Sequence, residues 1–418
     1  MPPVLPVTNR ISLKTISINE ETVKGKLAGL KPSSSPGPDK IHPRILREGA
    51  EFLARPLSVI YSKSLESNCL PGDWTLGTIV PIFKKGNRQL PKNYRPVSLT
   101  AIPCKILESI VKDEVMEHLT TGGYLSKEQH GFRAKRSCST HLLEVINEWS
   151  QIIESGDPID ALYLYFQKAF DSVPHMRLLS KLERYGVSGK LLRWISAFLT
   201  GRQQQVVVGG QTSSWAPVSS GVPQGSVLGP VLFIVYINDL PETVQSSMKL
   251  FADDTKIYSN VSCSSGPVQL QGDLDAISRW SDIWQMPFNR DKCSSLHVGS
   301  RNPRHVYTMR GNALDQSSIE RDLGIRVDYV LKFQNRLPLQ LRRLTRCWHS
   351  SGGRSRALTR IHFRSSTRPS YVPTWSMETW FGGPSTERTR SCWKGYSVGP
   401  RSLSRASSIC PTQSGSAI

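Results

Sequence analysis

The sequence has few cysteines, and they are scattered. Its eight cysteines are spread over 418 residues without a Cys-x-x-Cys pair, and no cysteine and histidine cluster has the spacing of a zinc site. This pattern argues against a zinc centre and against a dense disulfide framework. We therefore expect the reduced thiols of an intracellular protein.

Long hydrophobic runs are also missing. The longest apolar stretch, residues 227–237, is interrupted by glycine and proline, and it is shorter than the roughly 20 residues that cross a bilayer. The first six residues, MPPVLP, lack the basic region and apolar core of a secretory signal. We expect neither secretion nor membrane insertion, and no membrane partner.

Acidic residues are scarce relative to basic ones. The chain has 53 Lys plus Arg against 33 Asp plus Glu, a net charge of +20, which favours nucleic acid as a partner ahead of an anionic membrane. Residues 337–418 carry 13 Lys plus Arg against 2 Asp plus Glu, together with 16 serines and no sustained apolar period. We predict that this basic tail is disordered.

Apolar periodicity predicts a mixed α and β fold between residues 40 and 330. The expected helices cover residues 44–66, 104–119, 139–153, 178–185, 190–200 and 268–286. The expected strands cover residues 78–83 and 159–166, a hairpin over 204–218 around Gly209-Gly210, and two arms, 248–251 and 255–258, around an acidic turn.

That acidic turn is the first of four motifs that carry chemistry. Residues 251–254 (FADD) place Asp253 and Asp254 side by side, and two such carboxylates repel each other unless a cation neutralises them. A hard ion such as Mg²⁺ takes few protein carboxylates and completes its shell with water and phosphate oxygens, as phosphoryl and nucleotidyl transfer require. An ordinary solvated turn is the alternative interpretation.

The other three motifs are a glycine-rich turn and two mixed segments. Residues 221–225 (GVPQG) allow the backbone to approach a flat ligand such as a base pair, and Gln224 can bond to base or sugar edges; an ordinary turn before a buried helix is the alternative. The third motif, 166–175 (FQKAFDSVPH), follows a predicted strand, and the fourth, 93–100 (NYRPVSLT), follows Lys84-Lys85.

In order and spacing, these motifs resemble the reverse transcriptase domain of non-long-terminal-repeat (LINE-type) retrotransposons, particularly the jockey and chicken-repeat branches. The resemblance extends over residues 31–333 and includes 129–133 (QHGFR), 289–293 (NRDKC) and 321–325 (RDLGI). It implies an α+β right-hand polymerase in a nuclear setting. The implied parts are a partly disordered extension (1–38), fingers (39–158), palm (159–300), the start of a thumb (301–336) and the tail (337–418).

The resemblance also implies a reaction and a set of site residues. RNA would be the template, DNA the primer, and Mg²⁺ the cofactor, bound by Asp253 with Asp254 in a lesser role. Lys292 would protonate the departing pyrophosphate, although a solvated turn lysine is the alternative. Lys84 and Arg95 would bind the triphosphate of the incoming deoxynucleotide. Phe170 would exclude a 2′-hydroxyl, and Gln224 with Gly225 would contact the nucleotide and the template.

Two departures from the family pattern put catalysis in doubt. Tyr165 stands where the family has an aspartate that bridges both metal ions, and a phenol is neutral at physiological pH and a poor Mg²⁺ ligand. Asp160, about 16 Å away along an extended strand at roughly 3.3 Å per residue, and Asp171, six residues beyond Tyr165, are expected to be too far away to replace it. After Phe333 the family continues with a helical thumb sequence, whereas this chain has an Arg/Ser-rich sequence. This difference indicates either a frame-shifted, decaying copy or a lineage-specific tail.

We therefore predict an RNA-directed DNA polymerase domain impaired by Tyr165. The alternative is a catalytically inactive relic that binds nucleic acid. A third interpretation, a basic interaction protein with accidental motifs, conflicts with the ordered series of matches.

Overall fold

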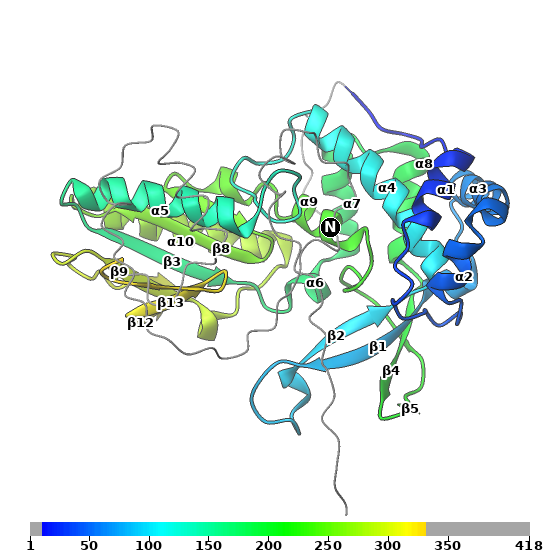
Figure 1. The fold of residues 1–418 in the computed structure, drawn as a ribbon. Coiled ribbons are helices and arrows are strands. Elements are labelled where there is room, and N and C mark those ends of the chain that lie inside the picture. The colour runs from blue at the N-terminus through cyan, green and yellow to red at the C-terminus, as the bar shows by residue number, and fades with distance from the viewer. Residues whose placement is uncertain (1–10, 332–418) are drawn as a thin grey trace, which may run out of the picture. The chain divides into compact units, whose positions relative to one another are not determined.

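The computed structural model describes residues 11–331, which form a mixed α and β unit (Figure 1). The predicted α+β class is therefore confirmed. The predicted basic tail, residues 337–418, lies outside the described residues.

The N-terminal part of the unit is helical. Its helices are α1 (Glu20–Ala28), α2 (Pro43–Glu48), α3 (Ala50–Ser67), α4 (Ile102–Thr121) and α5 (Cys138–Glu154). Asn19 caps α1 by accepting a hydrogen bond from the Thr22 backbone N–H at 2.6 Å. Val23 and Leu27 of α1 are fully buried in the main core, so this part of the predicted extension belongs to the folded unit.

The first sheet combines strands from two distant parts of the sequence. It consists of β1 (Leu76–Phe83), β2 (Tyr94–Leu99), β4 (Gln203–Val208), β5 (Gln211–Thr212) and β6 (Ala216–Pro217). β1 pairs antiparallel with β2 and parallel with β4. The predicted turn at Gly209-Gly210 joins β4 to β5, but the second arm is split into β5 and β6 instead of one strand. Residues 203–217, which we assigned to the palm, thus share a sheet with β1 and β2.

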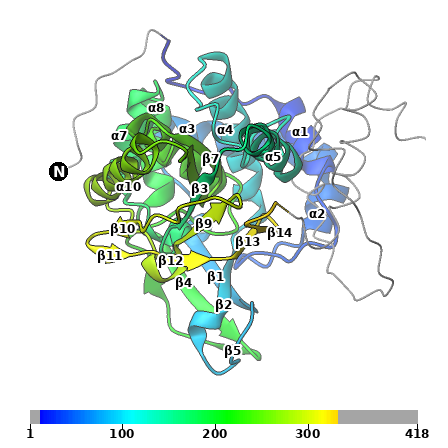
Figure 2. The ribbon, with the colours of Figure 1, turned by 90° about the vertical axis from the view of Figure 1, so that its left-hand side faces the viewer.

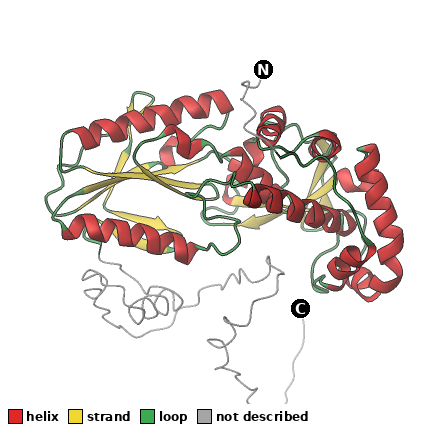
Figure 3. Ribbon diagram, turned by 90° about the horizontal axis from the view of Figure 1, so that it is seen from above, coloured by secondary structure: helices red, strands yellow, loops and turns green. Residues whose placement is uncertain are grey.

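The second sheet has the order β12-β9-β3-β8-β7. Its strands are β3 (Ile159–Tyr165), β7 (Ser247–Phe251), β8 (Asp254–Asn260), β9 (Ser294–Val298) and β12 (Asp315–Ser317). Ile159, Ala161 and Tyr163 of the central strand β3 pack with residues of α5, while Leu162 and Leu164 belong to the core that includes α10 (Ser265–Trp284). One helix therefore covers each face of this sheet (Figure 3), which explains why β3 is apolar nearly throughout.

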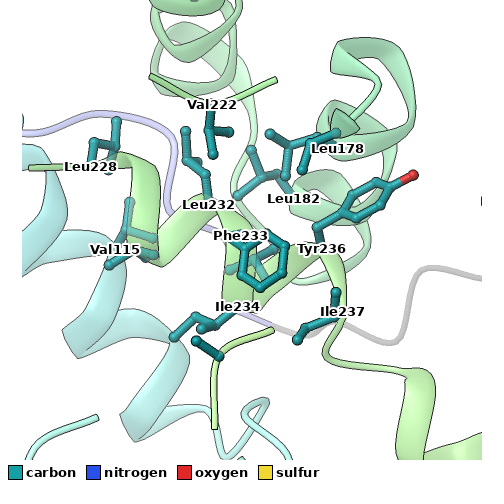
Figure 4. Packing of buried hydrophobic residues seen from close by; sticks show 14 of the residues in the cluster. Val115, Leu178, Leu182, Val222, Leu228, Leu232, Phe233, Ile234, Tyr236 and Ile237 are labelled. Atoms are coloured by element: carbon teal, nitrogen blue, oxygen red, sulfur yellow. The ribbon is translucent and has the colours of Figure 1, made fainter. Parts of the chain in front are cut away.

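Further helices lie between β3 and β7: α6 (Ala169–Ser172), α7 (His175–Arg184), α8 (Gly189–Leu199) and α9 (Gly229–Tyr236). Every residue of α9 except Pro230 is buried, and Figure 4 shows Val115, Leu178 and Leu182 packed around its side chains. The longest apolar stretch of the sequence is thus a central core helix. None of the helices described between residues 11 and 331 is long and apolar enough to cross a membrane.

Two small hairpins follow β9. They are β10 (Thr308–Met309) with β11 (Asn312–Ala313), and β13 (Ile319–Asp322) with β14 (Ile325–Asp328). Short 3₁₀ turns are present at Gly72–Thr75, Pro91–Asn93, Leu240–Thr243 and Arg290–Lys292. Across residues 11–331 the cysteines are free thiols, as expected: Cys69, Cys104, Cys138, Cys263 and Cys293.

Candidate active site

The two predicted carboxylates lie at a tight hairpin turn. Phe251 of β7 pairs with Asp254 of β8, so only Ala252 and Asp253 form the connection. Ala252 has a φ of 53°, a left-handed conformation that is uncommon for a residue with a side chain. The predicted arms around the acidic turn are confirmed, and the strained turn needs support from its surroundings.

That support comes from the QHGFR segment. The backbone of Glu128 and His130 exchanges hydrogen bonds with Leu250 of β7, at 3.0 and 2.8 Å. The Gln129 side-chain oxygen accepts from the backbone N–H groups of Ala252 at 3.0 Å and Gly131 at 2.7 Å. Gln129 therefore joins this segment directly to the backbone of the acidic turn, a role that we did not predict.

Gly131 makes this contact possible. A Cβ atom on Gly131 would lie 2.4 Å from the Ala252 nitrogen, so a larger residue would push the segment away from the turn. We expect Gly131→Ala to lower the free energy of unfolding by about 1–3 kcal/mol, as overpacking does. Urea denaturation measures this change.

The matched control is Gly272→Ala, in the middle of α10, where the added Cβ meets no atom within 4 Å. It should stabilise the protein by about 0.5–1 kcal/mol, because alanine favours a helix. If both substitutions have the same effect, the close approach at Ala252 is unimportant.

Tyr165 lies next to the acidic turn. It is the last residue of β3 and pairs with Asp254 across the sheet. Its backbone is fixed by a hydrogen bond from the Asn289 N–H to the Tyr165 carbonyl, at 2.7 Å. Burial and the nearby carboxylates of Glu320 and Asp254 raise the pKa of its phenol above the ordinary value, so the phenol stays neutral.

The two carboxylates of the turn have different surroundings. Asp254 lines a small cavity of about 20 Å³ together with Tyr165, Lys256 and Asp322. Burial raises the pKa of Asp254 to about 7, and the negative charges of Asp253 and Asp322 contribute to this rise. Asp322 in turn forms a buried ion pair with Lys256. This side of the turn has an excess of carboxylates.

Asp253 instead faces cations. Burial raises its pKa, while Arg95, Lys292 and Lys84 oppose the rise. Burial and the positive charges of Arg95 and Lys292 lower the pKa of Lys84. Arg95 belongs to β2, Lys292 ends the 3₁₀ turn Arg290–Lys292, and Lys84 directly follows β1. We call these three residues the cation cluster.

The β1–β2 hairpin places two members of the cation cluster together. Ile82 pairs with Arg95, and the Lys84 N–H donates to the Asn93 carbonyl at 2.8 Å. The structure therefore brings Lys84 and Arg95 from one hairpin, and Lys292 from a distant part of the sequence, to Asp253.

The glycine-rich loop 221–225 connects this region to β2. The Ser98 N–H donates to the Gln224 carbonyl at 2.7 Å. Gly225 has a φ of 124°, and a Cβ there would lie 2.4 Å from the Ser98 oxygen. A Cβ on Gly221 would similarly lie 2.7 Å from the Asp171 backbone. The glycines thus allow close backbone contacts with protein on both sides, and the approach of this loop to a base pair stays a prediction.

A buried carboxylate that we did not predict fixes the end of this loop. Glu108 of α4 is fully buried, and it accepts hydrogen bonds from the N–H groups of Val227 at 2.7 Å and Leu228 at 3.1 Å. Burial raises its pKa. The only signal in the sequence was a glutamate at an apolar position of a predicted helix.

Phe170 lies between the glycine-rich loop and the QHGFR segment. Its ring stacks on Phe233 of α9 with centroids 4.6 Å apart, and it meets Phe132 edge to face at 6.5 Å. Its carbonyl accepts from the Val222 N–H at 2.8 Å. These contacts hold the half-buried ring in one position.

Asp160 and Asp171, the two aspartates nearest to Tyr165 in its own segment, are engaged elsewhere. Asp160 is fully buried and binds His297 at 2.7 Å, Asn302 at 2.8 Å and Tyr307 at 2.6 Å. Asp171 interacts with Lys168 and Lys84. Between residues 11 and 331, no three His, Cys, Asp or Glu side chains form a group that could hold a metal ion.

Comparison with known proteins identifies this arrangement. The family described as "Reverse transcriptase (RNA-dependent DNA polymerase)" matches residues 82–327, which include the acidic turn and the cation cluster. The chain belongs to the reverse transcriptase family.

Three of its relatives belong to mobile elements of Drosophila melanogaster. The chain is 29% identical over 342 residues to the RNA-directed DNA polymerase from mobile element jockey, covering 78% of this chain and 37% of the relative. It is 28% identical over 354 residues to the probable RNA-directed DNA polymerase from transposon BS, covering 80% and 38%, and 26% identical over 310 residues to that of transposon X-element, covering 72% and 34%. The chain thus spans little more than a third of these relatives. The predicted assignment to a LINE-type, jockey-like reverse transcriptase domain is confirmed.

Proposed function

We propose that this reverse transcriptase domain binds a DNA primer, an RNA template and a deoxynucleoside triphosphate, but synthesises DNA slowly because of Tyr165. The observation that carries the proposal is the convergence of Lys84, Arg95 and Lys292 on Asp253 from three separate elements. Three cations around one carboxylate leave an excess of positive charge, which suits the binding of a negatively charged triphosphate.

The donor set fits one Mg²⁺ ion better than two. Asp253 and Asp254 are adjacent carboxylates. Burial, together with the charges of Asp253 and Asp322, raises the pKa of Asp254 to about 7, and a bound cation would favour its charged form. In nucleotidyl transfer, paired divalent ions stabilise the attacking and leaving oxygens. The neutral phenol of Tyr165 does not supply the third carboxylate that such a pair needs, so we derive no catalytic step through a second ion.

The remaining residues receive roles that match their contacts. Lys84 and Arg95 bind the triphosphate, and Lys292 donates a proton to the departing pyrophosphate. The rigidly stacked Phe170 excludes a 2′-hydroxyl from the nucleotide. Gln224 and Gly225, fixed against Ser98, contact the nucleotide and the template.

The same contacts support the proposed parts of a right-hand polymerase. Residues 39–158 form the fingers and contribute Lys84 and Arg95, residues 159–300 form the palm with Asp253, and residues 301–336 begin the thumb. Strands β4–β6 are the exception, because they complete the fingers sheet. A nucleic-acid partner and free thiols support an intracellular, nuclear location.

A second candidate function is an inactive protein that only binds nucleic acid. Tyr165 beside Asp254 favours it, since binding needs the cations and not the missing carboxylate. The two candidates differ only in whether a slow, Mg²⁺-dependent synthesis remains.

The test measures binding and synthesis separately. We expect primer–template affinity to fall roughly 10³-fold or more between 50 and 200 mM salt if at least six phosphates are contacted; fluorescence anisotropy of a labelled primer–template measures this. We expect slow primer extension with Mg²⁺, abolished by Asp253→Asn.

Three outcomes would change this proposal. Binding that is absent at low salt, or unchanged by salt, contradicts the proposed function. Extension that is undetectable at any Mg²⁺ concentration favours the inactive protein. Fast extension by the unaltered chain contradicts the impairment by Tyr165.

A further inference from the structure

A second cavity lies between α10 and the β10–β11 hairpin. It has a volume of about 240 Å³ and is lined by Ser278 of α10, by Phe288 and Arg290, and by Met309, Arg310 and Asn312 of the β10–β11 hairpin. This volume is below the roughly 300–1,000 Å³ of sites that enclose drug-sized ligands, so the cavity suits one small planar group.

The cavity is separate from the acidic turn. Tyr165 packs toward the face of the sheet that α5 covers, whereas Phe166, the next residue, belongs to the core on the α10 face. Phe288 stacks on Phe166, with centroids 4.3 Å apart and an angle of 22° between the rings. The Phe288 wall of the cavity therefore lies on the α10 face of the sheet, and none of the lining residues belongs to the acidic turn or to the cation cluster.

The walls of the cavity are fixed to the core. Gln271 of α10 exchanges two hydrogen bonds of 2.9 Å with the backbone of Thr308, which attaches β10 to the helix. Figure 2 shows β10 and β11 beside α10. On the other wall, stacking on Phe166 fixes the Phe288 ring. A rigid aromatic ring at the wall of a cavity suits stacking with a nucleobase.

Two arginines supply charge at this cavity. Arg290 donates to the Ala313 carbonyl at 3.3 Å, so its guanidinium remains largely available. Arg310 forms an ion pair with Asp282, but both side chains are more than half exposed, at 54% and 65%. Exposed pairs of this kind contribute little stability, and a phosphate can therefore replace the carboxylate. Residues 290–313 carry five Lys or Arg against one acidic residue.

Arg310 occupies a position where arginine is unfavourable. The turn between β10 and β11 consists of Arg310 and Gly311, with φ values of 52° and 75°. Turns of this type favour asparagine, aspartate or glycine. A strained residue at the edge of a cavity often has a role beyond folding, and here the strain places a guanidinium at the cavity.

We propose that this cavity binds one unstacked nucleotide of a single-stranded nucleic acid, with the base on Phe288 and the phosphate between Arg290 and Arg310. The Ser278 oxygen and the Asn312 amide provide hydrogen-bond partners for the edge of the base or the sugar. The domain then has a contact with single strands that is independent of the primer–template site at the acidic turn.

The experiment measures binding of the full chain to fluorescein-labelled octamers of riboadenylate and deoxyadenylate by anisotropy at 50 mM salt. Arg310→Glu and Phe288→Leu should each weaken binding about tenfold or more, because stacking and charged contacts are each of that size. The matched control is Arg301→Glu, which makes the same charge change in the same basic segment at an exposed residue that does not line the cavity. It should weaken binding less than threefold.

Circular dichroism and thermal unfolding must show that each variant is folded. Primer–template affinity should change less than threefold in Phe288→Leu, which separates this proposal from the proposed function. Equal losses in Arg310→Glu and Arg301→Glu would mean that general surface charge binds the strand, and the proposal would be wrong.

The choice of ligand tests which part of the strand is bound. Adenosine monophosphate that binds as tightly as the octamers would overturn the proposal, because it would show a site for free nucleotides instead of strands. Similar affinity for both octamers supports recognition of base and phosphate, and a ribose preference supports a contact to the 2′-hydroxyl.

Discussion

Tyr165→Asp should extend a DNA primer on an RNA template at least about 100-fold faster than the unaltered chain. Changes that affect only the outer partners of a metal ligand already alter activity by roughly 10–100-fold, and under our proposal this substitution supplies a ligand itself. The new carboxylate would lie opposite Asp254 in the sheet, beside the turn that carries Asp253. Primer extension under single-turnover conditions measures the rate.

Thermal unfolding with and without Mg²⁺ tests the same idea without relying on synthesis. A further carboxylate at position 165 increases the local repulsion, since the pKa of Asp254 is already raised to about 7 by burial and by the charges of Asp253 and Asp322. Without Mg²⁺ the variant should therefore unfold at a lower temperature than the unaltered chain. Added Mg²⁺ should stabilise Tyr165→Asp more than the unaltered chain, because a ligand that binds only the folded state raises stability.

The matched control is Tyr165→Asn, which has the size of aspartate without its charge. It should remain slow in primer extension, and Mg²⁺ should stabilise it no more than it stabilises the unaltered chain. Adding Asp253→Asn to Tyr165→Asp should abolish synthesis again. If Tyr165→Asp binds Mg²⁺ and primer–template but remains inactive, the residue at position 165 alone does not explain the lack of synthesis, and our proposal is wrong on this point.

The acidic turn could be predicted from sequence because its signals are local. Two apolar arms around FADD specify a hairpin, and the family motifs assign Asp253, Lys84 and Arg95 to one site. Local patterns also predicted the main helices and strands, since apolar periodicity reflects which face of each element is buried. In the structure Arg95 and Lys84 act on Asp253, and their assignment to a nucleotide site stays a prediction.

The hydrogen bonds that hold the acidic turn and the glycine-rich loop in place could not be predicted, because each joins residues far apart in the sequence. Gln129 contacts Ala252, 123 residues away, and Glu108 contacts Val227, 119 residues away. Helix α1 was missed for the same reason, since Val23 and Leu27 acquire their burial from other elements. The split second arm of the β4 hairpin follows from β6 pairing with Gln203 and Gln204 at the start of β4, which no local pattern specifies.

Lys181 provides the largest stability effect that we expect from a single substitution. This lysine of α7 is fully buried, donates to Asp239 at 2.6 Å and lies 3.7 Å from the centre of the Trp284 ring. The Trp280 N–H also donates to Asp239, at 3.1 Å. Asp239→Asn leaves the buried ammonium without its counter-charge and should lower the free energy of unfolding by about 3–5 kcal/mol. Urea denaturation measures the loss.

A double substitution separates the unpaired charge from the loss of packing. Lys181→Met together with Asp239→Asn removes both charges and keeps similar volumes, so it should recover much of the stability that Asp239→Asn loses. If the double variant is as unstable as the single one, the hydrogen bonds of Asp239 stabilise this region more than its charge does.

The pH dependence of stability provides an independent test of Lys181. Burial lowers the pKa of Lys181 to about 8 from its ordinary value of 10.5, although Asp239 opposes the change. The unfolded chain therefore binds this proton more tightly than the folded chain does, and the contribution of Lys181 to stability rises as the pH increases from about 8 to 10.5. Lys181→Met should lack this rise, so the difference between the two unfolding free energies should change with pH only within that interval. A constant difference from about pH 7 to 11 would mean that Lys181 keeps its ordinary affinity for the proton despite its burial among the two tryptophans.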